Sequence, residues 1–346
     1  MLTIDLQGAQ ALLEFLQLVR EGHLPGVAEL EIVMAANAFF VDFCSHWEGL
    51  SREKIAKAMV HFDQPERIPS ERLLAQLVEG FRQTVDDADR LKEKIDWLRT
   101  VDPAAINERV LTYLPSDTPL DSVIHITVDA LNNAFVHQGE MGVSLLRGFT
   151  DRQAFEGAVA HELHHVGFRF WAERDPVRQA LLQEQSGRSV AVQHVQNLLA
   201  EGMANYFCTP ETVFREEPDE FASDPFEAKL GRLYREEAAL FAQAEKVLAM
   251  SLDPRADFEQ CRQALLALAL DVEQCLLPVA HYLGARMLQG MDRAHSRDEI
   301  VGCVQNLPRF LAMYNQAAQK AGGFVYTPEL VDQFGRLWES ESMSEE

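Results

Sequence analysis

Five consecutive residues, HELHH at 161–165, constrain this chain more than any other part of its sequence. On a helix, residues four apart lie on one face, so His161 and His165 can aim two imidazole nitrogens at one point. Zn²⁺ binds imidazole nitrogen at about 2.0–2.1 Å and can accept such a pair. Glu162 projects toward the same side, where it can take a proton from a metal-bound water. The motif therefore predicts a helix that carries two metal ligands and a general base.

The residues around the motif predict that this helix forms. Thr150 and Gln153 have the spacing of a Thr-x-x-Gln capping box, which marks a helix start. Partly apolar spacing continues to about Glu173. Asp175 precedes Pro176, and a residue before proline is pushed out of the α region, so the helix should end there.

A second predicted helix, residues 189–207, supplies a third ligand. Catalytic zinc usually takes three protein ligands and leaves one position for water. Glu201, 36 residues after His165, is the candidate. Asn205 shares its helical face, and its side-chain oxygen can accept the second N–H of a metal-bound histidine. The apolar face of this helix is formed by Val192, Val195, Leu199 and Met203.

The succession of HELHH and EGMAN resembles the gluzincins, the thermolysin-like clan of zinc metallopeptidases, over about residues 120–207. The resemblance implies one Zn²⁺ held by His161, His165 and Glu201, with Glu162 as general base. Asn205 stands where many members carry Asp, which alters the surroundings of the ligands. A metzincin site needs Gly three residues and His six residues after the second motif histidine. Those positions hold Phe168 and Trp171, which excludes that clan.

The resemblance also implies a hydrogen-bond donor for the developing oxyanion, a Tyr or His on a later helix. The segment 278–287, PVAHYLGARM, is the best source, and Pro278 can begin a helix there. Tyr282 is the first choice and His281 the second. A half-buried core tyrosine is an equal alternative for Tyr282, and a structural role is favoured for His281.

The other histidines and the cysteines have weaker links to the site. His164 points about 100° away from the ligand pair, which favours packing or a hydrogen bond. His194 is seven residues before Glu201, and we expect it at the surface or next to the ligands. Scattered cysteines without a CxxC motif predict reduced thiols of a cytoplasmic protein and no further zinc ligand. They are Cys44, Cys208, Cys261, Cys275 and Cys303.

The net charge argues against two classes of partner. The net charge of −23 disfavours nucleic acid, which needs a basic surface, and anionic membranes. The sequence contains no run of 18 uncharged apolar residues, so we expect no membrane span. Asp5 and Glu14 interrupt the first apolar stretch, so we expect no signal peptide.

The expected fold is mainly α with a small β-sheet (α+β) and a gluzincin-like core between helical lobes. Three parts are expected, residues 1–101, 102–210 and 211–346. The middle part should contain strands at 109–114, 122–128 and 141–146, ahead of the motif helix. The segment 139–148 is the candidate edge strand for an extended peptide. An acidic linker, 211–227, should lead to helical segments that include 228–250 and 258–277.

The predicted function is a zinc-dependent hydrolase, in the first place a metallopeptidase that cleaves peptide bonds through a zinc-bound water. Its substrate would be a peptide or a small amide. Three alternatives stay open: a hydrolase of non-peptide amides or esters, a non-catalytic zinc-binding scaffold, and a protein that binds no metal.

Overall fold

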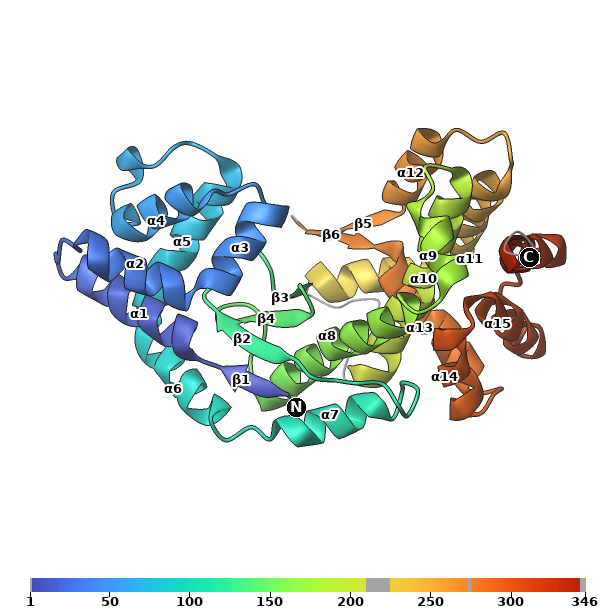
Figure 1. Cartoon of the computed structure of the whole chain (residues 1–346), viewed down its shortest axis with the longest axis horizontal. Coiled ribbons are helices and arrows are strands. Elements are labelled where there is room, and N and C mark those ends of the chain that lie inside the picture. Colours follow the sequence, from blue (N-terminus) through green and yellow to red (C-terminus); the bar gives the residue numbers. More distant parts are fainter. Residues whose placement is uncertain (1, 210–224, 273–274, 343–346) are drawn as a thin grey trace. The chain divides into compact units, whose positions relative to one another are not determined.

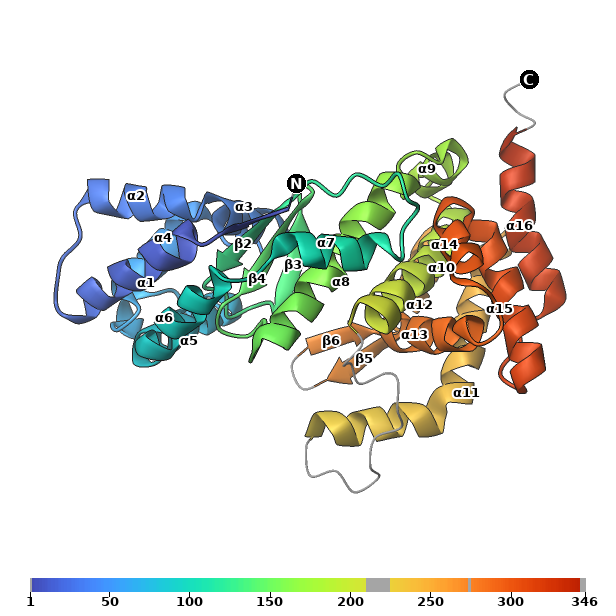
Figure 2. The same cartoon turned by 90° about the horizontal axis from the view of Figure 1, so that it is seen from below.

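A computed structural model describes residues 2–209, 225–272 and 275–342 (Figures 1 and 2). The chain forms two compact units, Met1–Glu108 with Leu120–Val166, and Arg109–Pro119 with Gly167–Glu346. Both are rich in helix, and the first contains a four-stranded sheet, which confirms a mainly α protein with a small sheet. The unit boundary cuts the predicted middle part, 102–210, and the three-part division stays a prediction.

The sheet of the first unit has the strand order β1-β2-β4-β3. β2 is parallel to both of its neighbours, and β3 is antiparallel to β4. Side chains of one face, among them Ile124 and Met141, are fully buried. The strands are β1 (Thr3–Asp5), β2 (Val123–Thr127), β3 (Ala134–His137) and β4 (Glu140–Ser144).

The sheet corrects three expectations. The strand predicted at 109–114 is wrong, because α7 (Pro103–Leu111) covers its first half and a turn follows. The first strand, β1, lies in a segment expected to be helical. Segment 139–148 is no edge, because β4 pairs with β2 on one side and with β3 on the other. The β3–β4 turn uses Gln138 and Gly139, with φ of 51° and 82°, as a two-residue hairpin turn requires.

Helices pack around this sheet. Asp87 separates two of them, α5 and α6. The helices are α1 (Gln7–Arg20), α2 (Val27–Ala36), α3 (Ala38–Trp47), α4 (Arg52–His61), the short 3₁₀ turn η1 (Pro65–Arg67), α5 (Arg72–Asp86) and α6 (Ala88–Leu98).

Helix α8 (Arg152–Ala172) contains the HELHH residues, and the unit boundary falls within it, after Val166. Its N-terminus differs from the predicted capping box. Asp151 provides the cap, because its Oδ1 accepts the backbone N–H of Ala154 at 2.9 Å, while the Thr150 hydroxyl donates to the Asp151 carboxylate. A carboxylate at this position also interacts favourably with the helix dipole.

The second unit is built around α10 (Gly187–Met203), whose side chains are buried on nearly all sides. A π-helical turn, η2 (Ala204–Cys208), continues it. Figure 2 shows α13 running beside α10. The other helices are α9 (Pro176–Gln183), α11 (Pro225–Leu252), α12 (Phe258–Leu266), α13 (Val279–Asp292), α14 (Arg297–Gln305), α15 (Leu307–Ala321) and α16 (Pro328–Ser342).

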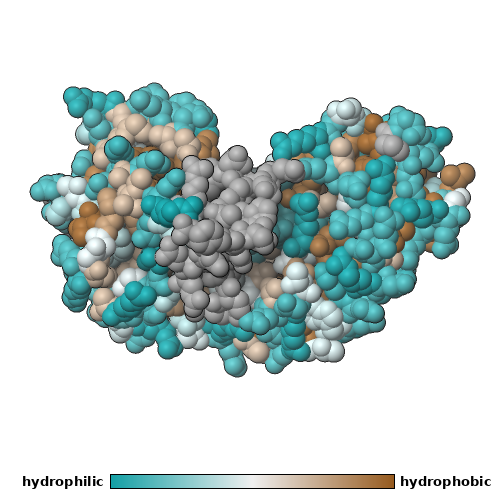
Figure 3. Space-filling model, turned by 180° about the vertical axis from the view of Figure 1, so that it is seen from behind, coloured by the Kyte–Doolittle hydropathy of each residue, from teal (hydrophilic) through white to brown (hydrophobic). Residues whose placement is uncertain are grey.

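The prediction of one helix over 258–277 is correct only for the first part of this segment. α12 ends at Leu266, and an antiparallel hairpin follows, formed by β5 (Ala269–Val272) and β6 (Cys275–Pro278). Most of the predicted linker 211–227 lies outside the described residues, and α11 begins at Pro225. On the face drawn in Figure 3, hydrophilic side chains predominate and hydrophobic ones form small groups. Among the described helices, we find none with the length and apolarity that a membrane span requires.

Candidate metal centre

One group of candidate residues contains the histidine pair of α8. The Nε2 atoms of His161 and His165 are 3.0 Å apart, and their rings lie edge to face. Tetrahedral zinc with bonds of about 2.0–2.1 Å would hold two nitrogens about 3.3 Å apart. The helix therefore brings both atoms to within a few tenths of an ångström of that separation. Both side chains and that of Glu162 are half-buried, so they remain open to solvent on one side.

A buried lysine fixes the segment that leads into α8. The Lys94 ammonium donates to the backbone oxygens of Leu145 and Phe149 at 3.1 and 2.7 Å and lies 4.6 Å above the Phe149 ring. Burial lowers the pKa of Lys94. The Trp97 and Phe155 rings also contact Phe149. Helix α6 thus holds the β4–α8 connection, which sets where α8 begins.

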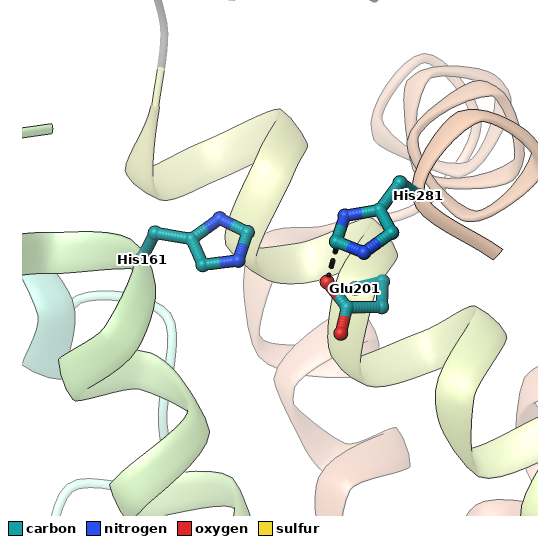
Figure 4. A group of neighbouring side chains, drawn as sticks. All are labelled: His161, Glu201 and His281. Atoms are coloured by element: carbon teal, nitrogen blue, oxygen red, sulfur yellow. Dashed lines mark ion pairs between the residues drawn. The ribbon is translucent and has the colours of Figure 1, made fainter. Parts of the chain in front are cut away.

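A second group lies within the second unit and joins α10, η2 and α13. The Glu201 carboxylate is 3.0 Å from His281 Nδ1, and Figure 4 shows the two side chains turned toward one another. The Asn205 amide group donates to the Glu201 backbone oxygen at 2.8 Å, and its nitrogen is 3.1 Å from the same His281 Nδ1. Asn205 therefore supports His281 with its nitrogen, which differs from the predicted use of its oxygen toward a ligand.

His281 Nδ1 can serve only one of these two partners at a time. A protonated Nδ1 donates to the Glu201 carboxylate, whereas an unprotonated Nδ1 accepts from Asn205. In the second case a neutral ring carries its proton on Nε2. His281 therefore has two well-defined tautomers. Which of them forms depends on whether the Glu201 carboxylate is available to accept the Nδ1 proton or is bound to a metal.

Two glycines set the distance between the helices that carry Glu201 and His281. A Cβ on Gly202 would lie 2.6 Å from the Gly284 carbonyl, and one on Gly284 would lie 2.3 Å from the Leu198 oxygen. Only glycine allows the α10 and α13 backbones to approach so closely. Sequence reasoning missed this role, although an isolated Gly within each predicted helix was a signal for close packing.

Tyr282 belongs to the core of the second unit. Its side chain is fully buried, and its hydroxyl donates to Glu237 at 2.7 Å. Burial and this carboxylate raise the pKa of Tyr282. Arg286 donates to the same Glu237 oxygen at 2.6 Å. This environment matches the core alternative for Tyr282, while its catalytic role stays a prediction.

The remaining candidates are placed away from solvent. His164 is fully buried on α8, in keeping with a packing role. His194 is also buried, so the expected surface position is wrong, while a position next to the ligands stays a prediction. Its ring bonds to the Ala244 backbone on α11, and burial lowers its pKa to about 4. Cys208 is a buried free thiol whose pKa burial raises to about 12, which leaves it protonated and unsuited to zinc.

The predicted residues thus form two groups, each assembled within its own unit. His161, Glu162 and His165 share α8, and Glu201, Asn205 and His281 meet in the second unit. Imidazole nitrogens and a carboxylate are the donors that zinc prefers.

A family model matches residues 34–323, and its description reads "Putative zinc dependent peptidase (DUF5700)". The chain belongs to this family. No curated protein and no solved structure matches it. The matched region of this DUF5700 member includes both groups of site residues, and the family description supports zinc and peptide hydrolysis.

Proposed function

We propose that this DUF5700 member is a zinc metallopeptidase that cleaves peptide bonds with Glu162 as general base. The observation that carries the proposal is the pair of imidazole nitrogens on α8, 3.0 Å apart, in a family described as zinc dependent peptidases. We infer that His161, His165 and Glu201 hold one Zn²⁺. Their nitrogen, nitrogen and oxygen donors form a usual set for catalytic zinc.

When bound, zinc would act as a Lewis acid, which lowers the pKa of water and polarises the scissile carbonyl. Glu162 follows the first ligand on α8 and takes a proton from the attacking water, which it then passes to the leaving amine. With Glu201 committed to the metal, His281 Nδ1 accepts from Asn205, and the ring proton resides on Nε2. His281 can then donate to the developing oxyanion, which makes it our first choice ahead of Tyr282.

We also propose that the substrate pairs with β3 and not with segment 139–148. β3 ends the strand order of the sheet, so its outer side is an edge that can accept an extended peptide. The substrate class in this proposal is a peptide, and the buried free thiols suit a reducing compartment such as the cytoplasm.

The test combines metal analysis with one substitution. Protein purified without added metal should contain about one equivalent of zinc or take it up on addition. Glu162→Gln should keep the zinc and lose at least about a hundredfold in peptide hydrolysis, the usual contribution of a general base. The matched control is Glu156→Gln on the same helix, which weakens an ion pair with Arg152.

The outcomes separate the alternatives. Unchanged hydrolysis by Glu162→Gln would overturn the mechanism. Zinc binding with hydrolysis of esters or non-peptide amides alone would favour a different hydrolase. Zinc binding with all coordination positions filled by protein would favour a scaffold, and no zinc uptake would remove every zinc-based function.

A further inference from the structure

A cavity of about 890 Å³ lies in the second unit, and none of the predicted site residues lines it. The end of α8, the start of α9, the α14–α15 junction and one face of α16 form its walls. This volume is in the range of small-molecule sites, which are about 300–1,000 Å³. The cavity therefore has room for a ligand larger than a single small ion.

Two tryptophans line the cavity, and both indole N–H groups are used within the protein. Trp338 Nε1 donates to Asp175 Oδ2 at 3.0 Å, and Trp171 Nε1 donates to Thr118 Oγ1 at 2.7 Å. What the two rings offer to a ligand is therefore their carbon surface. These bonds also fix the ring orientations, so the apolar surfaces are formed before a ligand arrives.

The charges of the cavity balance. Arg174 and Arg336 line it together with Asp175, Asp332 and Glu339. Behind the wall, the fully buried Arg178 places its Nε 3.5 Å from the Asp175 carboxylate and donates to the Val304 oxygen. With Arg178 counted, three cationic and three anionic side chains lie in or next to the wall, which favours neither a cationic nor an anionic ligand.

The helix ends at the cavity do not form an anion site. Asp175 Oδ1 accepts the Arg178 backbone N–H at the start of α9, and Asn306 Oδ1 accepts that of Arg309 at the start of α15. These side chains occupy the groups that would otherwise bind phosphate or carboxylate. Strand addition of a peptide is also disfavoured, because it needs main-chain groups of a strand, and the walls are helical.

The cavity thus offers indole carbon surfaces and polar side chains whose charges balance. A neutral ligand with both apolar C–H faces and many hydroxyls fits this lining. Indole rings cover the apolar faces of a pyranose. The planar polar groups of Gln305, Asp332 and Arg336 can each bind neighbouring hydroxyls through two atoms. We propose that this cavity binds a neutral oligosaccharide, as a site separate from the residues proposed for peptide hydrolysis.

The test is binding of the full chain to an array of neutral glycans, followed by calorimetry with the glycan that binds best. Trp338→Ala should weaken binding at least about tenfold, because it removes an aromatic wall. Trp338→Phe keeps a ring and should stay within about threefold of the wild type. Arg336→Ala changes an exposed side chain and should weaken binding several-fold without affecting the fold.

Trp47→Ala is the matched control, since Trp47 is an exposed tryptophan of the first unit outside the cavity. It should bind like the wild type. Failure to bind any neutral glycan would overturn the proposal, as would equal binding by Trp338→Ala and Arg336→Ala. Binding of neutral peptides in a parallel array, lost in the same two variants, would replace it with a peptide site. Each readout is independent of zinc and of hydrolysis.

Discussion

The close crossing of α10 and α13 gives the sharpest stability prediction. In Gly284→Ala the new Cβ would lie 2.3 Å from the Leu198 backbone oxygen, and real Cβ atoms essentially never approach closer than 3.0 Å. The helices must therefore separate by about 0.7 Å, the difference between these distances. A backbone oxygen cannot rotate away, so we expect the upper part of the range for overpacking, about 3 kcal/mol.

Higher helix propensity of alanine offsets about 1 kcal/mol, which leaves a net loss of about 2 kcal/mol. In domains of about 150–250 residues, each kcal/mol corresponds to about 2–4 °C, so the Tm should fall by about 4–8 °C. The same separation displaces Glu201, the proposed third ligand, from its contact with His281, now 3.0 Å away, and should weaken zinc retention.

The assay is scanning calorimetry of the metal-free protein, with zinc retention measured separately. Gly290→Ala is the control, because Gly290 lies on the same helix and a Cβ there meets nothing within 4 Å. That variant should gain up to about 1 kcal/mol from helix propensity. A Gly284→Ala protein as stable as Gly290→Ala would refute the close-packing argument.

Two further predictions concern pH and metal. Unfolded His194 binds a proton below about pH 6.5, whereas the folded residue resists protonation until about pH 4. As the pH falls from about 6.5 to about 4, the free energy of unfolding should therefore decrease by about 1 kcal/mol per pH unit. In His194→Gln, urea unfolding should show a smaller dependence of this free energy on pH. The exposed His46→Gln should keep it, and an unchanged slope in His194→Gln would contradict the assignment. Glu201→Ala should retain less zinc and lose the Tm increase that zinc gives the wild type. Equal retention would mean that another residue is the third ligand.

Local patterns in the sequence were sufficient where a single helix or strand decides the outcome. The spacing of His161 and His165 predicts that their nitrogens meet, and 3.0 Å between them follows from one helical turn. The apolar face of α10 and the strand at 122–128 were predicted for the same reason, because the side-chain period is a property of the local backbone.

Tertiary contacts decided what the local patterns left open. The strand order made β4 internal and β3 an edge, since pairing partners far apart in the chain set that order. Burial among helices placed Tyr282 against Glu237, while its neighbour His281 lies beside Glu201. Sequence periodicity identifies the face of a helix, whereas the partner of that face depends on packing across the whole unit. The residue types of the site were thus readable from the chain, and their pairing was decided by long-range contacts, above all by Gly202 and Gly284.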